Sequence, residues 1–250
     1  MNVLEILSKA KAERATKLSL NRLDLRLLPP ELFEIESLEE LSLDENLLVE
    51  LPEEIGNLGN LKKLSVGYND LMELPASIGN LTKLESFYAG YNCLSELPET
   101  IGNWTNLKQL RVGQNQIQEL PATIGEWKSV QKLSLHDNFI TELPSSIWRL
   151  KTVRKIYLDN NSLSEISPEI GGMENLEILI LSGNNLAEIP SELGCLQKLR
   201  ELVLDKNQLT DIPEELSNCK SLDVISLAEN PIPEKRAKEL AAKLQKKIEL

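Results

Sequence analysis

The chain has 250 residues, 41% of them hydrophobic, and carries 27 basic against 39 acidic residues, a formal net charge of −12. Because phosphate groups are bound by clustered Lys and Arg, this balance argues against a nucleic-acid-binding protein and against an anionic membrane surface as partner. No apolar stretch approaches the length of a membrane span, and the three cysteines, Cys93, Cys195 and Cys219, are predicted to be free thiols in a reducing compartment.

Residues 1–14 predict a short helix. Asn2 is a suitable N-terminal cap, and the apolar residues after it recur on one side: Val3, Leu4, Ile6, Leu7 and Ala10. The segment is too charged, and its apolar run too short, for a cleaved secretory signal. We expect it to cover the first end of the repeat array that follows.

Residues 15–232 consist of ten repeats of 23 residues in unbroken phase, the last truncated. Counting each repeat from its first residue (Ala15, Leu38, Leu61 and so on), positions 4 and 6 are apolar between polar neighbours, as in Leu64 and Val66. This alternation predicts a strand with one buried face. A strict period of this length predicts a solenoid in which the strands stack in parallel.

Two further positions are nearly constant. Position 9 is Asn in nine repeats, and we expect these amides to be structural, binding backbone groups of their own and the adjacent turn: Asn46, Asn69, Asn92, Asn115, Asn138, Asn161, Asn184, Asn207 and Asn230. A Leu-Pro pair follows in most repeats, so the opposite side should contain extended pieces and 3-10 turns. In the seventh repeat Ser167-Pro168 moves the proline by one place, which predicts a locally different turn.

Residues 233–250 predict a second cap, a helix with a stripe of Ala237, Leu240, Ala241, Leu244 and Ile248. Its lysines leave two alternatives open, a partner-binding helix or a helix at a membrane surface. A cap is favoured because the end of a repeat array must be sealed.

The frame Leu-x-x-Leu-x-Leu-x-x-Asn-x-Leu-x-x-Leu-Pro-x-x-Ile resembles that of the intracellular LPxxI-type leucine-rich repeat proteins, which include Ras-pathway scaffolds, Scribble-like proteins and bacterial members. The resemblance covers nearly the whole chain. It implies a single α/β domain over residues 1–250: a right-handed, horseshoe-shaped solenoid with a concave parallel sheet, convex 3-10 or extended segments, and helical caps at both ends.

Enzyme chemistry finds little support. The chain has one histidine, His136, so neither a histidine-based metal site nor a Cys-His pair is easily assembled. Asp159 occupies the same repeat position one strand on, and we expect at most a surface hydrogen bond between the two. No phosphate-binding glycine motif is present. We therefore predict no catalytic residues, no metal and no cofactor.

Position 13 is acidic in eight successive repeats: Glu50, Glu73, Glu96, Glu119, Glu142, Glu165, Glu188 and Asp211. Such a row of like charges costs stability unless it is solvated or paired. Solvation explains it, and a cationic partner or bound metal ions are the alternatives.

The residues expected on the concave face vary most. All four tyrosines fall on its positions, Tyr88 and Tyr157 at position 5 and Tyr68 and Tyr91 at position 8. Position 7 is Gly67, Gly90 and Gly113 in succession, which predicts a shallow trench beside a Tyr-Arg-Tyr ridge containing Arg111. Because Tyr and Arg are enriched at interfaces, these residues predict a binding surface, although tyrosine also suits a half-exposed sheet.

Ile178, Ile180, Val203 and Val224 should extend this surface as a solvent-facing aliphatic group. Trp104 and Trp127, at position 21, are predicted to be core. Phe33 and Trp148, at position 19, are open to two interpretations, surface anchors or packing variants.

We predict a non-enzymatic scaffold that binds a protein or peptide on its concave face, with neither nucleic acid nor membrane as partner. The predicted contact residues are Tyr68, Tyr88, Tyr91, Arg111, His136, Tyr157, Ile178, Ile180 and Val203, with Lys132, Arg154 and Lys155 as a basic edge. The alternatives are a recognition subunit of a GTPase- or ubiquitin-linked assembly and an exported bacterial effector. We expect a cytoplasmic monomer, with weak self-association through the aliphatic group as the alternative.

Overall fold

The computed structural model describes residues 2–244 and 247–249. The chain divides into two compact parts, Met1–Val130 and Gln131–Leu250. The interpretation of residues 1–250 as one domain stays a prediction. No described helix is long and apolar enough to cross a membrane.

The first part begins with α1 (Val3–Ala12), which confirms the predicted N-terminal helix. Asn2 and Glu5 form a reciprocal cap, in which the Asn2 side chain accepts from Leu4 N at 3.4 Å and the Glu5 carboxylate accepts from Asn2 N at 3.2 Å. Leu7 and Ala10 are buried, whereas Leu4, predicted to lie on the apolar side, is 48% exposed. The helix therefore packs through a narrower stripe than its sequence indicates.

Each repeat of the first part contributes one short strand, and neighbouring strands pair in parallel with a register of 23 residues, as in Leu41 with Leu64. The strands are β1 (Lys17–Ser19), β2 (Glu40–Ser42), β3 (Lys63–Ser65), β4 (Ser86–Tyr88) and β5 (Gln109–Arg111). In β2 to β5 the residue at position 4 is buried and its two strand neighbours are not, which confirms the predicted alternation.

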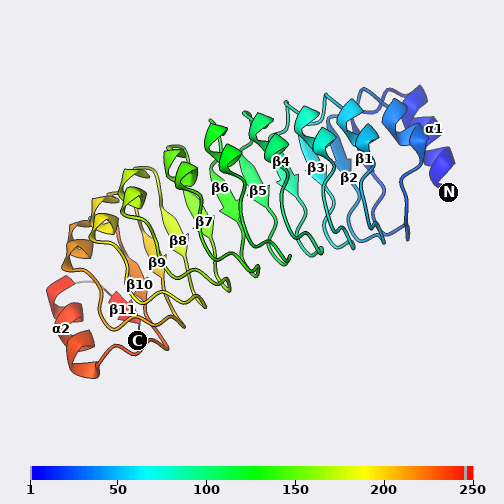
Figure 1. Cartoon of the computed structure of the whole chain (residues 1–250). Coiled ribbons are helices and arrows are strands. Elements are labelled where there is room, and N and C mark those ends of the chain that lie inside the picture. Colours follow the sequence, from blue (N-terminus) through cyan, green and yellow to red (C-terminus); the bar gives the residue numbers. More distant parts are fainter. Residues whose placement is uncertain (1, 245–246, 250) are drawn as a thin grey trace. The chain divides into compact units, whose positions relative to one another are not determined.

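Short 3-10 helices lie on the side of each repeat opposite the strands (Figure 1). In the first part they are η1 (Pro30–Glu34), η2 (Glu53–Asn57), η3 (Ala76–Asn80), η4 (Glu99–Asn103) and η5 (Ala122–Glu126). A proline in extended conformation precedes each of them, such as Pro52 with φ −71°. Since its ring fixes φ and it has no N–H to donate, proline favours a short turn over a long helix here.

The second part repeats the plan. Its strands are β6 (Lys132–Ser134), β7 (Lys155–Tyr157), β8 (Ile178–Ile180), β9 (Glu201–Val203) and β10 (Val224–Ser226), and its 3-10 helices are η6 (Ser145–Arg149), η7 (Pro168–Gly172), η8 (Ser191–Cys195) and η9 (Glu214–Asn218). The helix η7 occupies the same repeat positions as the others, so the predicted local difference is confined to its cap. There the Ser167 hydroxyl accepts from Glu169 N at 3.3 Å.

The C-terminal cap differs from the prediction. The helix α2 (Glu234–Leu244) ends before the predicted boundary, and β11 (Lys247–Glu249) then pairs in parallel with β10. The unpaired backbone groups at the edge of β10 favour this strand over further helix. Leu240 is fully buried, as the predicted stripe requires. The side chains of Ala237, Ala241, Leu244 and Ile248 lie outside the described residues.

The position-9 asparagines bind backbone groups in neighbouring repeats. Asn92 donates to the carbonyl oxygens of Val66 (3.0 Å), Ala89 (3.2 Å) and Gly90 (3.3 Å) and accepts from Leu71 N (3.0 Å). Nearly all of these side chains are buried. The amides satisfy turns that the sheet leaves unpaired, which confirms their structural role.

In two repeats position 21 is a buried tryptophan whose indole N–H is hydrogen-bonded. Trp104 and Trp127 are buried, as predicted, and their indole N–H groups donate to Ile78 O and Ile101 O at 2.9 and 2.8 Å. Phe33 and Trp148 are 8% and 6% exposed, so the structure favours packing variants over surface anchors.

Candidate functional site

The candidate surface is the face of the sheet that carries positions 3 and 5, together with the turn positions 7 and 8. Position 5 alternates with the buried residue at position 4, so its side chain leaves the core. In the first part this surface contains Tyr68, Tyr88, Tyr91 and Arg111; in the second it contains the remaining predicted residues.

Three tyrosines form one cluster in the first part, which we call the tyrosine cluster (Tyr68, Tyr88, Tyr91). The rings of Tyr68 and Tyr91 are stacked, with centroids 4.2 Å apart and planes 9° apart. Both remain 47% and 44% exposed, and both have left-handed backbone, with φ of 54° and 58°. A bulky residue rarely adopts this conformation, so the backbone does not explain the choice of tyrosine.

Tyr88 occupies the predicted trench. A Cβ atom on Gly67 would lie 2.3 Å from Cε1 of Tyr88, and one on Gly90 would lie 2.8 Å from Cε2. The Tyr88 ring therefore packs against both glycines and fills the space that the sequence predicted to be a shallow trench. Burial, followed by the nearby Tyr68 and Asp44 side chains, raises the pKa of Tyr88 to about 12.

Arg111 pairs with Tyr88 across β4 and β5 and is exposed. Its Nη2 donates to Gln109 Oε1 at 2.7 Å. Ser65, at the same repeat position as Tyr88, donates its hydroxyl to the two carboxylate oxygens of Asp44, at 2.7 and 2.8 Å.

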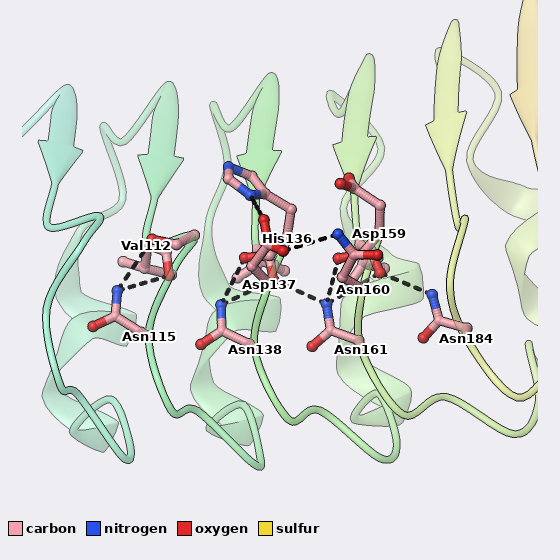
Figure 2. Close-up of polar contacts among 12 residues, drawn as sticks. Val112, Asn115, His136, Asp137, Asn138, Asp159, Asn160, Asn161 and Asn184 are labelled. Atoms are coloured by element: carbon pink, nitrogen blue, oxygen red, sulfur yellow. Dashed lines mark hydrogen bonds and ion pairs between the residues drawn. The ribbon is translucent and has the colours of Figure 1, made fainter. Parts of the chain in front are cut away.

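In the second part, His136 and Asp159 follow the ends of β6 and β7, and Figure 2 shows Asp137 beside them. The imidazole Nδ1 lies 2.7 Å from Asp137 Oδ2, so its partner is the adjacent Asp137, whereas the sequence pointed to Asp159. Asn160 Nδ2 donates to the other oxygen of Asp137 at 2.8 Å. Burial raises the pKa of Asp159, and the Asp137 carboxylate also raises it.

The other predicted residues of the second part lie on adjoining strands. Tyr157, Ile180 and Val203 are in register with one another on β7, β8 and β9, and all are half-buried, as is Ile178. Glu201 lies between Ile178 and Val224, which breaks the predicted aliphatic group on that row. We therefore restrict the aliphatic group to Ile178, Ile180 and Val203.

The predicted basic edge is partly neutralised. Lys132 Nζ lies 4.7 Å above the Tyr157 ring, a cation–π contact. Arg154 donates from Nε and Nη2 to Glu177 Oε1 at 2.8 and 2.5 Å.

Sequence reasoning missed several residues of this surface. Asp137 and Asn160 occupy position 8, the position that the tyrosines had already marked as informative. Outside this surface, Met72 and Phe139, at positions 12 and 10, are apolar side chains that are 65% and 56% exposed. Leu47 and Val49 occupy positions 10 and 12 of the second repeat and are 37% and 50% exposed.

The eight acids at position 13 are all exposed, consistent with solvation. Asp211 is additionally paired with Arg236 of α2, through contacts of 2.9 and 3.0 Å. The guanidinium lowers the pKa of Asp211.

Comparison with known proteins shows the family. Two family models match, described as "Leucine-rich repeat region" over residues 29–116 and "Leucine rich repeat" over 105–163, 128–186 and 174–232. A search of curated proteins finds no match.

Solved structures of similar fold include a leucine-rich repeat protein of Leptospira interrogans (22% identity, TM-score 0.72, 98% of both chains). A second is the ectodomain of the Arabidopsis thaliana receptor kinase GASSHO1/SCHENGEN3 in complex with CASPARIAN STRIP INTEGRITY FACTOR 2 (32% identity, TM-score 0.76, 86% of this chain and 27% of that one). A third is the plant peptide hormone receptor RGFR1 in complex with RGF2 (30%, TM-score 0.68, 93% and 47%).

This chain thus spans less than half of either receptor structure. The repeats, the paired strands and the family models agree, and the chain belongs to the leucine-rich repeat family.

Proposed function

We propose that this protein is a non-enzymatic scaffold that binds a protein or peptide on the strand-bearing face of its repeats. The leucine-rich repeat fold implies a protein-interaction module. The two receptor structures hold their partners in complexes, which supports a protein or peptide as the ligand class here.

The observation that carries the proposal is the tyrosine cluster. Two stacked aromatic rings remain nearly half exposed, on backbone that disfavours bulky residues, and a third ring is fixed beside them on two glycines. Tyrosine supplies large contact area with few rotatable bonds, and a ring already held in place loses little entropy on binding. Arg111 adds an exposed cation at the edge of this cluster.

In the second part, Tyr157, Ile178, Ile180 and Val203 form a more apolar surface, with His136 nearby on the turn after β6. We propose it as a second contact region. The aliphatic group offers the alternative of self-association. Light scattering over a range of concentrations, with native protein and Ile180→Lys, separates the two. If the native protein forms a dimer that the variant does not form, this region is a dimer interface and not a partner-binding surface.

The proposal is tested by affinity capture with a Tyr91→Ala/Arg111→Ala variant, read by quantitative mass spectrometry against native protein. Both side chains are exposed, so we expect the melting temperature to change little while the specifically captured protein or peptide is lost. The matched control is Arg26→Ala, which removes an exposed arginine outside the strands. Equal capture by the double variant, the control and the native protein would refute the site.

We also propose a cytoplasmic location. The described cysteines are free thiols, one of them, Cys195, exposed, which suits a reducing compartment. Fractionation with an antibody to the native chain tests this, and recovery of the chain outside the cell would contradict it.

A further inference from the structure

Two aspartates at position 7, Asp44 in the first part and Asp205 in the second, accept the same pair of hydrogen bonds from the following repeat. Asp44 Oδ1 accepts from Gly67 N and from the Ser65 hydroxyl, both at 2.7 Å. Asp205 Oδ1 in the second part accepts in the same way from Ala228 N at 2.8 Å and from the Ser226 hydroxyl at 2.5 Å. An acid at position 7 is therefore satisfied by the serine at position 5 of the next repeat.

Asp159 stands at position 7 without this arrangement. The next repeat has Ile180 at position 5, so no hydroxyl is available there. Among the described residues of the second part, no donor from the next repeat is within hydrogen-bond distance of the Asp159 carboxylate. A half-buried carboxylate is thus left with only part of the hydrogen bonding that Asp44 and Asp205 obtain.

His136 and Asp137 lie beside it, one repeat earlier. One ligand atom each from His136, Asp137 and Asp159 lies within 4.8 Å of the others. The closest pair, His136 Nδ1 and Asp137 Oδ2, is 2.7 Å apart, and the Asn160 amide holds the second oxygen of Asp137 (Figure 2). Such a bond to a ligating carboxylate is a common outer-sphere support at metal sites.

The three ligand atoms are close enough for side-chain movements to bring them onto one ion. With bonds of about 2.1 Å to a tetrahedral ion, ligand atoms are about 3.4 Å apart. The ligand atoms of the three residues lie within 4.8 Å of one another, so side-chain movements of roughly 1 to 1.5 Å would bring them to that spacing. Two carboxylates with one neutral imidazole carry a charge of about −2, which one divalent cation neutralises.

We propose that His136, Asp137 and Asp159 bind a first-row divalent transition-metal ion, with zinc as the probe, and that water completes its coordination. The imidazole favours zinc and its neighbours over calcium or magnesium, which prefer oxygen ligands alone. A bound ion would cross-link the turns after β6 and β7. The single histidine had argued against a metal site built on histidine clusters; this site needs only one.

The single histidine also gives a test that needs no mutation. Every imidazole signal in a proton–nitrogen NMR spectrum belongs to His136. Titration of metal-stripped native protein with zinc chloride should shift those signals and saturate at one equivalent. Signals unchanged beyond one equivalent would overturn the proposal.

Affinity is measured in parallel by competition with a zinc-binding dye. We expect His136→Ala and Asp159→Asn each to weaken zinc binding at least tenfold, and calcium to bind the native protein at least tenfold more weakly than zinc. Asp205→Asn is the matched control, because Asn21 shows that an amide at position 7 accepts the same two hydrogen bonds. Cys195→Ser controls for the exposed thiol. Affinity that falls only in Cys195→Ser, or is equal in all variants, would mean adventitious zinc only and would refute the site.

Discussion

Gly67→Ala tests the geometry of the tyrosine cluster directly. The added methyl would lie 2.3 Å from Tyr88 Cε1, more than about 1 Å inside ordinary contact distance. Gly67 does not have left-handed backbone, so alanine is compatible with its conformation. The whole cost should therefore come from the collision with Tyr88, and overpacking of this kind destabilises by about 1–3 kcal/mol.

The collision is isolated by a double-mutant cycle with Tyr88→Ser, since serine occupies this repeat position at Ser42 and Ser65. In the Tyr88→Ser background Gly67→Ala should be neutral, or stabilising by up to about 1 kcal/mol through the reduced freedom of the unfolded chain. Urea unfolding followed by tryptophan fluorescence gives all four free energies. Gly59→Ala is the control, because no atom lies within 4 Å of the added methyl. Additive effects, with coupling below about 0.5 kcal/mol, would refute the placement of the Tyr88 ring.

Three further predictions concern stability. Asn92→Ala should lower the free energy of unfolding in urea by about 2–4 kcal/mol, because it leaves Leu71 N and carbonyl oxygens unpaired. Asn106→Ala, which removes one exposed hydrogen bond, should lower it by less than about 1 kcal/mol. Equal losses in the two variants would contradict this. The pKa of Asp211 is lowered in the folded state, so its pairing with Arg236 stabilises the fold above the unfolded pKa, and this stabilisation is lost as pH falls. Arg236→Gln should therefore be slightly less stable than native protein in urea unfolding at neutral pH, and the difference should vanish in acid; a difference that persists in acid would contradict this. The pKa of Tyr88 is raised to about 12 in the folded state, so the stabilisation from its neutral phenol is complete below the pKa of the unfolded state and is lost as pH rises. Tyr88→Phe should therefore reduce the fall in stability above about pH 10, measured by urea unfolding at each pH. An unchanged alkaline slope would disprove this.

The fold could be predicted because the same pattern of buried residues and prolines recurs in each repeat. A buried strand at positions 3–5 and a proline before each 3-10 turn both follow from local chemistry in a fixed period, and the structure places them as expected. At the C-terminus the period ends, and there local pattern was misleading. The apolar stripe predicted helix through Ile248, but the open edge of β10 supplied a pairing partner that no local pattern contains.

Site residues could be placed on a face, but their partners could not be predicted. The direction of the Tyr88 ring depends on a rotamer and on the space above Gly67 and Gly90, which only side-chain packing determines. For His136 the sequence indicated Asp159, which occupies the same repeat position one strand on, whereas its hydrogen-bond partner is the adjacent Asp137. Asp137 has left-handed backbone, with φ 53°, which ends the alternation and returns its carboxylate to the imidazole.

One relation unites these observations. In several repeats the residue at position 5 contacts position 7 of the repeat before it, as Ser42 does Asn21 and Ser226 does Asp205. Ser65 donates to Asp44, while the large Tyr88 requires Gly67. Where position 5 is large and lacks a donor, as at Ile180, and position 7 is nevertheless acidic, the pair satisfies neither pattern. Asp159 is that exception, and a carboxylate without its usual donor next to the only histidine of the chain is where a cation would supply the missing stabilisation.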